Sequence, residues 1–258
     1  MEITVSNHRH PAFPQPSDEG SAIWRYMAFD KFESLVTTRT LYMCRADLLS
    51  DEFEGTTPAA ELESWRIAAE NAPTEEERNV ILDNRVQLSD FAREFQNKYY
   101  LSCWHMACEE NIAMWERYVS GPDSVVVRTR YSTLNGQLNH AVVNLAMVRY
   151  IDYDRDPLPS LNMMQLITHK RHFFADEREV RAVMWSLSAE PANGQFIKPF
   201  MLPDTRGYTP PVDVKALVEG VILHPRATPD FEKRVAELCS AHELPAPARS
   251  RIASPPTF

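Results

Sequence analysis

Glycine is scarce in this 258-residue chain, which has 7 glycines against 19 prolines. The sequence contains neither a G-x-G-x-x-G motif nor a P-loop, the two glycine-rich turns that hold nucleotide phosphates against backbone amides. A glycine-rich phosphate cradle is therefore excluded, and the loops of the protein are stiffened by proline.

The chain also lacks a basic surplus, a disulfide framework and a long apolar run. Its net charge of -9 argues against non-specific binding to nucleic acid or to an anionic membrane, since both need a basic surface. Its 4 cysteines lie among apolar neighbours without disulfide-like spacing, as expected in a reducing compartment. No apolar run approaches the roughly 18 residues of a membrane span, and no charged start leads into an apolar block. We therefore expect a cytoplasmic protein without a membrane partner.

Composition and pattern favour one α+β domain. Apolar content of 44% and charged content of 24% are near the globular average, and the length allows a substantial core. We predict a single domain over residues 23–243, with a flexible N-terminal arm over 1–22 and a flexible Pro-rich tail over 244–258. The predicted strands and helices do not alternate strictly, which favours a mixed central sheet flanked by helices.

Hydrophobic periodicity predicts the individual elements of this domain. The expected strands cover residues 23–27, 41–44, 99–104, 125–127, 142–151 and 218–223. The expected helices cover residues 29–36, 58–98, 111–119, 161–167 and 231–241. The second of these helices is broken near Pro73, where Thr74 and Glu77 have the spacing of a capping box.

The most informative stretch runs from Phe173 to Trp185, where charged residues lead into an apolar strand. Alternation along this strand places Glu179 and Arg181 on one face at its mouth, a costly position for an ion pair that serves stability alone. The spacing of Glu177 and Glu179 also places two carboxylates together, so one can have a raised pKa while the other stays ionised. The alternative is an exposed, charged helix end.

Two more stretches place charged residues among aromatic or apolar ones. Arg25 follows Trp24 in a strand, where it can bind a phosphate or carboxylate through two hydrogen bonds, or simply pack its stem with its head in water. The acidic segment from Arg45 to Gly55 is either a substrate-facing or metal-facing loop, or a solvated turn closed by an internal pair of Arg45 with Asp47. Its spacing is not that of an EF-hand.

A cysteine and histidine cluster follows the strand at residues 99–104. Cys103, His105 and Cys108 offer soft ligands close together, but a tetrahedral zinc site needs a fourth ligand. Cys103 acting as a nucleophile with His105 is equally weak, because alternate residues of one strand diverge from hydrogen-bond contact. A buried thiol is the commoner fate of such a cysteine, and we expect no metal.

The same stretches carry a resemblance to the bacterial family catalogued as domain of unknown function 2971. Its members typically show an aromatic-R-Y-M start, an L-Y-x-x-R-A-D-x-x-x-D-x-F-E-G segment, an S-C-W strand, a helix with M-W-x-x-Y and a late E-x-E-x-R stretch. Here the motifs stand, in that order, at Trp24–Met27, Leu41–Gly55, Ser102–Trp104, Met114–Tyr118 and Glu177–Arg181. Glu52 stands where members usually have proline, which removes a turn constraint from that loop.

More distantly, the chain resembles the ADP-ribosyltransferase fold. Domains with that fold begin with a strand whose Arg or His holds the dinucleotide, continue to a central strand with Ser or Tyr, and end with a strand that opens with Glu-x-Glu or a lone Glu. The order of Arg25, Ser102 and the pair Glu177 and Glu179 is similar. Fold analogy of this kind is an expectation and not a demonstration of activity.

This resemblance implies NAD as the cofactor and a set of residue roles. Arg25 and Ser102 are expected in cofactor binding, with Arg25 neutralising the pyrophosphate. Tyr26 or Trp104 would stack on nicotinamide or adenine. Glu179 would stabilise the positive charge that develops on the ribose, and Glu177 would activate the acceptor group. These catalytic roles are listed for Glu179 and Glu177 alone.

Three functions are compatible with these residues. The first is an NAD-dependent ADP-ribosyltransferase-like protein that modifies an unknown macromolecule or nucleotide, as a toxin or antiphage effector, with a substrate-facing set of Arg45, Asp47, Asp51, Glu54 and Arg181. The second is a non-catalytic binding or regulatory module held by a buried ion-pair network of Arg25, Arg45, Asp47, Asp51, Glu54 and Arg181. The third is a nuclease-like metal hydrolase using Asp47, Asp51, Glu54 and Glu179.

Overall fold

The computed structural model describes residues 11–139, 142–160, 162–186, 189–192, 195–199, 205–254 and 256. The helices are α1 (Phe29–Thr38), α2 (Ala59–Glu70), α3 (Glu75–Phe95), α4 (Ile112–Tyr118), α5 (Tyr131–Leu138), α6 (Gln165–Thr168), α7 (Val214–Leu217) and α8 (Pro229–Ala241). Four short 3-10 helices accompany them, namely η1 (Ala46–Leu48), η2 (Gln96–Lys98), η3 (His172–Glu177) and η4 (Arg251–Ala253).

The strands form one large mixed sheet and two small pairs. They are β1 (Ala22–Ala28), β2 (Met43–Arg45), β3 (Tyr99–Met106), β4 (Ser124–Arg130), β5 (Val143–Met147), β6 (Arg149–Ile151), β7 (His169–Arg171), β8 (Glu179–Trp185), β9 (Ala189–Ala192), β10 (Gln195–Pro199), β11 (Gly207–Tyr208), β12 (Gly220–Leu223) and β13 (Ala248–Arg249). The large sheet runs β11-β2-β3-β1-β4-β12-β13, with β8 on the other edge of β3 and β5 beyond it. The predicted α+β class, a mixed central sheet flanked by helices, is confirmed.

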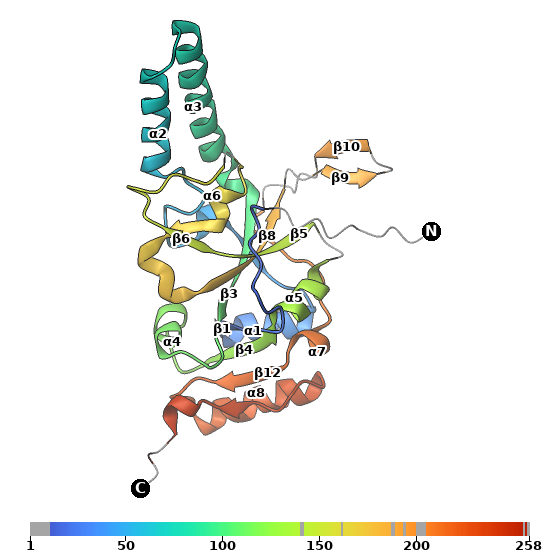
Figure 1. Ribbon diagram of the computed structural model, residues 1–258. Helices are drawn as coiled ribbons and strands as arrows, with labels where there is room; N and C mark the ends of the chain where they lie inside the picture. The colour runs from blue at the N-terminus through green and yellow to red at the C-terminus, as the bar shows by residue number, and fades with distance from the viewer. Residues whose placement is uncertain are drawn as a thin grey trace.

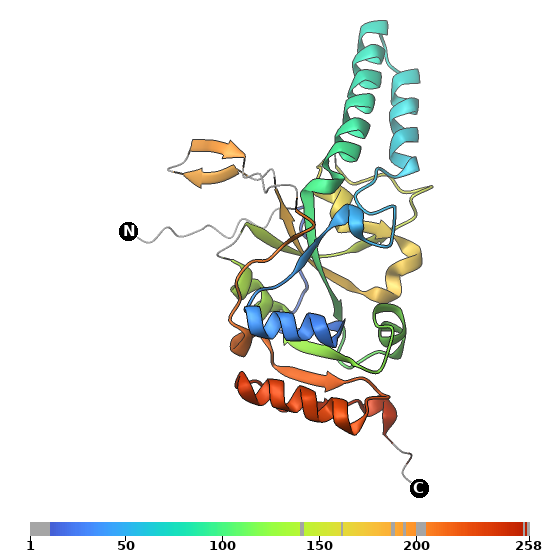
Figure 2. The same ribbon diagram turned by 180° about the vertical axis from the view of Figure 1, so that it is seen from behind.

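Figures 1 and 2 show how helices are distributed around this sheet. The hairpin of α2 and α3 projects from one end of the molecule, and α8 lies beside β12 at the opposite end. Phe231, Val235 and Cys239 of α8 are buried, whereas Ala92 is the buried residue of α3 among those whose side chains are described. The sheet end covered by α8 is therefore the more fully packed one.

The long strand β3 changes partner along its length, and this opens the sheet. Near its start, Tyr100 and Leu101 pair with β2, while near its end His105 and Met106 pair with β1. Beyond Trp24, β1 leaves β3 and continues along β4 only. Between the two pairings, a split separates β1 from β2, and the middle of β3 forms its floor.

The other edge of β3 is fully paired with β8, and the alternation predicted for β8 is confirmed. Val180 and Ala182 of β8 belong to the main core with Trp104, whereas Val183 belongs to a second core with Leu101. Every residue of β8 from Glu179 to Met184 is buried, because strands cover both of its edges and packed side chains cover both faces. Glu179 and Arg181 thus share a buried face.

The two terminal segments differ from the expected flexible arm and tail over their described parts. Phe13 is buried, and the backbone N–H of Met147 donates to the carbonyl oxygen of Pro14 at 2.7 Å. Leu244 belongs to the main core, and β13 pairs in parallel with β12. Residues 11–22 and 244–254 add to the sheet because they bring apolar side chains and unpaired backbone groups to its edges. The boundaries of the domain stay a prediction, and residues 1–10 lie outside the described residues.

Helix capping is where sequence and structure agree most closely. Thr74 caps α3, and its side-chain oxygen accepts a hydrogen bond from the backbone N–H of Glu77 at 3.2 Å. The expected strand at 142–151 is instead two strands, β5 and β6. Within the described residues, no helix combines the length and apolar character needed to cross a bilayer.

Candidate active site

A cavity of about 660 Å³ lies at the split in the sheet. This volume is within the usual range for small-molecule sites. The cavity is lined by residues of β1, β3, α1, α4, η3 and β8 and of the segment that contains β2; they include Arg25, Tyr26, Tyr42, Cys44, Cys103, Trp104, His105, Tyr118, Glu177 and Glu179. Of the residues that the sequence points to, Arg25, Tyr26, Trp104, Glu177 and Glu179 therefore come together around one hollow.

Arg25 reaches across the split from β1 to the segment before β2. Its Nη2 donates to the carbonyl oxygen of Tyr42 at 2.9 Å, and its guanidinium lies 5.8 Å from the centre of the Trp104 ring. Burial lowers the pKa of Arg25 to about 10, opposed by the nearby thiols of Cys103 and Cys44. Among the described residues, Arg25 forms no ion pair with a carboxylate. A cation in this position favours an anionic ligand, which would supply the missing counter-charge.

The two aromatic residues expected to stack on a ligand are already engaged with the protein. Trp104 is 1% exposed and lies beneath Arg25, and its Nε1 donates to Ser102. Tyr26 packs edge-to-face on Trp115 with ring centroids 4.9 Å apart, and its hydroxyl accepts from the backbone N–H of Asn111. Both line the cavity, so they shape its wall more than they offer an open ring face.

Ser102 does not line the cavity. It is 1% exposed, and its hydroxyl accepts the hydrogen bond from Trp104 at 3.1 Å. Cys103, the next residue of β3, lines the cavity instead, and its thiol is hydrogen-bonded to the carboxylate of Glu179. The difference follows from strand geometry, because neighbouring residues of a strand point to opposite faces.

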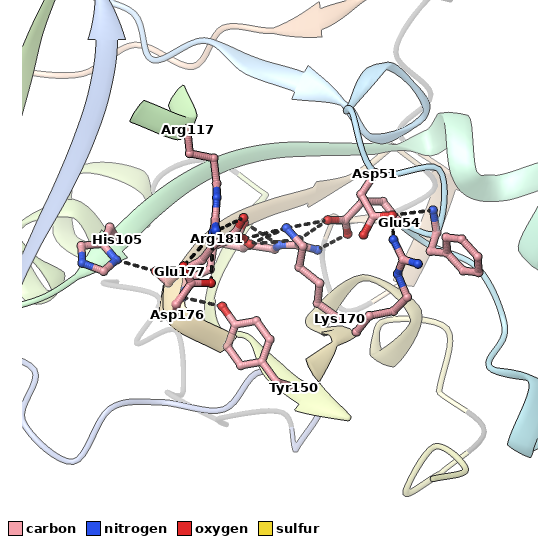
Figure 3. Close-up of polar contacts among 12 residues, drawn as sticks. Asp51, Glu54, His105, Arg117, Tyr150, Lys170, Asp176, Glu177 and Arg181 are labelled. Carbon is pink, nitrogen blue, oxygen red and sulfur yellow. Dashed lines mark hydrogen bonds and ion pairs between the residues drawn. The ribbon is translucent and has the colours of Figure 1, made fainter. Parts of the chain in front are cut away.

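Glu179 is held by a buried arginine (Figure 3). Arg181 is 0% exposed and donates through Nε and Nη2 to Glu179, at 2.8 and 3.1 Å. Arg181 also donates through Nη1 and Nη2 to Glu54, at 2.7 and 2.6 Å, and through Nη1 to the carbonyl oxygen of Ile167. One guanidinium thus binds two carboxylates in bidentate fashion, a geometry that fixes the orientation of both.

Lys170 of β7 joins the two cavity carboxylates. Its Nζ lies 2.7 Å from Glu177 and 3.5 Å from Glu179, and 3.2 Å from Glu54 on the far side of Arg181. The ring of Phe174 lies 4.6 Å from the same ammonium. The sequence-based interpretation did not include Lys170, which comes from a strand of three residues without a periodic pattern.

The environment pushes the pKa values of the two carboxylates apart. Burial acts to raise the pKa of Glu179, but the charges of Arg181 and Lys170 outweigh it and hold that pKa at about 2. Burial raises the pKa of Glu177, against the lowering effect of Lys170 and with a further rise from Glu179. Glu179 is therefore the fixed anion of the pair, and Glu177 is the carboxyl that exchanges a proton more readily.

Neighbouring side chains complete the wall around the carboxylates (Figure 3). Arg117 donates to Asp176 at 2.9 Å and lies 3.3 Å from Glu177. The hydroxyl of Tyr150 accepts from the backbone N–H of Glu179 at 2.8 Å, which fixes the start of β8. Burial raises the pKa of Tyr118, which is hydrogen-bonded to Glu177. Tyr118 and Tyr150 therefore remain neutral at ordinary pH.

The expected substrate-facing set is divided by the structure. Arg45 pairs with Asp47 at 2.6 Å, the internal pair that the sequence allows, and Asp51 pairs with Arg171 at 2.8 Å. Glu54 is 2% exposed and belongs with Arg181 to the buried pairs. The residues of this set are absent from the described lining of the cavity, which includes their neighbours Cys44 and Leu49.

The remaining candidate chemistries have less geometric support. Over the ranges that the structure describes, no group of three or more His, Cys, Asp or Glu side chains is arranged to hold a metal ion. Cys108 is exposed, while Cys103 and His105 face the cavity. Glu54 and Glu179, two of the proposed ligands of a metal hydrolase, enclose the guanidinium of Arg181.

Comparison with known proteins gives no family. No family model matches the chain, so its resemblance to domain of unknown function 2971 stays a prediction. No curated protein matches it either. Similar solved structures include three of DarT from Thermus sp. 2.9, in complex with ADP-ribosylated ssDNA, with carba-NAD+ and with NAD+. Their identities are 9%, 8% and 9%, each with a TM-score of 0.38, over 92%, 91% and 90% of this chain and 96%, 97% and 96% of theirs. At that TM-score the likeness supports no conclusion about this chain.

Proposed function

We propose that this protein is an NAD-dependent ADP-ribosyltransferase-like enzyme whose active site is the cavity at the split between β1 and β2. One observation carries the proposal. The cavity brings an arginine without a carboxylate partner, Arg25, together with two carboxyl groups of opposite pKa shift, Glu177 and Glu179. These three residues come from segments up to 154 positions apart, and they are the residues that the resemblance to the ADP-ribosyltransferase fold singles out.

NAD would bind as a substrate, with its pyrophosphate near Arg25. The pyrophosphate would give Arg25 the counter-charge that it lacks among the described side chains, without a glycine-rich loop. The cavity volume of about 660 Å³ is compatible with a ligand of several rings. Ser102 has no contact with the cavity, so we assign it no direct role and give its place on β3 to Cys103.

The reaction is transfer of ADP-ribose to a nucleophile. The bond between nicotinamide and the ribose breaks, its electron pair leaves with nicotinamide, and a nitrogen or oxygen of the acceptor forms a new bond to the same ribose carbon. Glu179, held as an anion by Arg181 and Lys170, would stabilise the positive charge that develops on the ribose. Glu177, with its raised pKa, would accept the proton that the acceptor loses.

The test compares two glutamates that bind the same arginine. Glu179→Gln and Glu54→Gln each remove one carboxylate from Arg181, but Glu179 lines the cavity and Glu54 does not. We expect both to lower the melting temperature, since one lost partner of a buried pair costs about 3–5 kcal/mol. Only Glu179→Gln should also reduce NAD turnover and label transfer to cell lysate, by about 10²–10³-fold at temperatures where both variants are folded.

Two outcomes would reject the role of Glu179. In the first, Glu179→Gln turns over NAD as fast as the unmodified protein. In the second, Glu54→Gln loses as much activity as Glu179→Gln, which would show that the cluster acts only through the stability of the fold. The acceptor is left open by this assay, because NAD turnover is measured together with labelling of all macromolecules in the lysate.

A second candidate function is a non-catalytic binding or regulatory module. It is favoured by the buried cluster of Glu54, Lys170, Glu177, Glu179 and Arg181, which fixes β7, β8 and the loop after β2 to one another. Such a module predicts that no nucleotide changes the melting temperature. A rise of the melting temperature with NAD that is lost in Arg25→Gln would count against it, because ligand binding stabilises only the state that it recognises.

A further inference from the structure

His105 has an unused hydrogen-bonding atom in the wall of the cavity. The residue lies on β3, is 4% exposed, and is among the residues that line the cavity. Among the described residues, its Nε2 has no hydrogen-bond partner. Buried polar atoms in native proteins are nearly all satisfied, so an unsatisfied one beside a cavity indicates a missing water or ligand group.

The tautomer of His105 is fixed by its other nitrogen. Nδ1 lies 2.5 Å from the backbone carbonyl oxygen of Glu177, as the dashed line in Figure 3 shows. A carbonyl oxygen only accepts, so Nδ1 carries the hydrogen and donates it. Burial lowers the pKa of His105, which keeps the ring neutral at ordinary pH. Nε2 is consequently a bare acceptor with a free lone pair.

The surroundings of His105 define what Nε2 can accept. His105 lies opposite Glu179 in the pairing of β3 with β8, and the ring of Tyr26 lies 6.5 Å away, centre to centre. A lone pair beside two carboxyl groups repels an anionic oxygen, whereas Arg25, against Tyr42, attracts one. The cavity therefore combines one contact for an anion with another for a hydrogen-bond donor.

We propose that Nε2 of His105 accepts a hydrogen bond from a neutral N–H or O–H group of the bound ligand, and that this contact orients the ligand beside Glu177 and Glu179. The identity of the ligand rests on the proposed function. In NAD, the shared chemistry has two sources, the amide of the nicotinamide and the hydroxyl groups of the adjacent ribose. His105 is a binding residue in this assignment and takes no proton.

The test is ¹⁵N NMR of the full chain labelled at histidine, with the signal of His105 assigned by its loss in His105→Asn. In the free protein we expect a protonated Nδ1 and a bare Nε2. Saturating NAD should shift the Nε2 resonance upfield, as for any imidazole nitrogen that gains a hydrogen-bond donor. Nicotinamide alone and ADP-ribose alone distinguish the two sources, and inorganic pyrophosphate, which lacks a neutral donor at neutral pH, should leave Nε2 unmoved.

Two substitutions separate the acceptor from the anchor. His105→Asn keeps a donor in the place of Nδ1 and removes Nε2, so it should retain the fold and bind the responding probe about 5- to 10-fold more weakly. His105→Gln places an amide oxygen within reach of the position of Nε2 and loses the anchor to Glu177. It should melt at a lower temperature yet bind more tightly than His105→Asn.

A protonated Nε2 in the free protein overturns the inference whatever the ligand. So does a bare Nε2 that responds to none of NAD, nicotinamide and ADP-ribose, or equal affinity of His105→Asn and the unmodified protein for the responding probe. A response to ADP-ribose or nicotinamide without any turnover of NAD has a different meaning. It supports the contact of His105 and rejects the proposed transferase activity, so the two failures are distinguishable.

Discussion

Lys170 controls the charge balance of the cavity at the scale of a single residue. Its ammonium contacts Glu177, Glu179 and Glu54 within 3.5 Å, and it is 8% exposed. Burial disfavours its charged form, but Glu179, Glu54 and Glu177 raise the pKa of Lys170 above its ordinary value. It therefore remains a cation over the range in which Glu177 titrates.

Replacing Lys170 by methionine should change the pH dependence of the proposed activity. Lys170 lowers the pKa of Glu177 against the effect of burial, so its loss raises that pKa further. If Glu177 acts as an ionised base, the acid limb of the pH–activity profile should move to higher pH, with turnover at neutral pH reduced on the order of 10-fold. The profile of NAD turnover, with a ¹³C NMR titration of labelled glutamate, measures both effects.

The control is Lys170→Arg, which keeps a cation on the same strand and should leave the acid limb close to its original position. A structural role alone would lower the melting temperature of Lys170→Met without moving the titration of Glu177. An unchanged acid limb in a folded and active Lys170→Met would contradict the assignment of Glu177 as the base.

Single residues were predictable where alternation along a strand decides their direction. Glu179 and Arg181 share a face of β8 as the pattern requires, and the pKa values of Glu177 and Glu179 are shifted in opposite directions as two adjacent carboxyls predict. Ser102 was placed at the site by family likeness, although the same alternation gives the cavity to Cys103 and His105. Lys170 carries no pattern of its own, because a three-residue strand has no period.

Helix ends of the same type have different consequences at the scale of an element. Thr74 caps α3 and Thr228 caps α8, and each accepts a hydrogen bond from a backbone N–H at 3.2 Å. The two helices differ in what they bury, since α8 buries Phe231, Val235 and Cys239 in the main core while α3 belongs to the projecting hairpin. Loss of a cap in α8 therefore disturbs the core, and loss in α3 disturbs the hairpin.

Thr74→Ala should cost about 1 kcal/mol of local helix stability, the usual value for a lost N-cap. Because α3 buries little, we expect faster amide hydrogen exchange in its first turns with little change of the global melting temperature. Thr228→Ala, the matched change in α8, should lower the global melting temperature. Equal shifts of the melting temperature in both variants would show that the hairpin unfolds together with the sheet.

Elements were predictable when they have their own hydrophobic pattern or cap. The helix at 58–98, its break at Pro73 and the cap at Thr74 were all readable, as were β1, β3 and α8. Strands β7, β11 and β13 contain two or three residues and exist because a partner strand offers hydrogen bonds. Such strands are set by tertiary pairing, which local sequence does not encode.

Buried histidines link the stability of the whole molecule to pH. Burial lowers the pKa of His105, His169 and His224 below the ordinary value of 6.5. The unfolded chain then binds protons below about pH 6.5 that the folded chain does not, so stability is lost as pH falls below that value. Glu179 adds a later loss, because its stabilising pairs, complete above an ordinary pKa of 4.5, disappear as pH falls through about 2. Glu177, whose pKa is raised, has the opposite sign.

The melting temperature should therefore decrease between pH 6.5 and pH 5, before the paired carboxylates titrate. Replacing His169, which is 2% exposed and lies outside the described cavity lining, should make this decrease shallower. His169→Gln tests this by calorimetry, with His172→Gln at an exposed position as the control. Parallel curves for the two variants would show that buried histidines do not set the acid sensitivity.

The alternation of β8 ties the chemistry of the cavity to the packing of the core. Odd positions of the strand supply Glu179 and Arg181, and even positions supply Val180, Ala182 and Met184 to the main core. A slip of one residue would exchange the two sets, burying charges among hydrocarbons and turning hydrocarbons toward the hollow. Point substitutions can thus remove activity and leave a folded relative, whereas an insertion or deletion within this strand removes both at once. A lineage of such proteins can lose its reaction while keeping its length here unchanged.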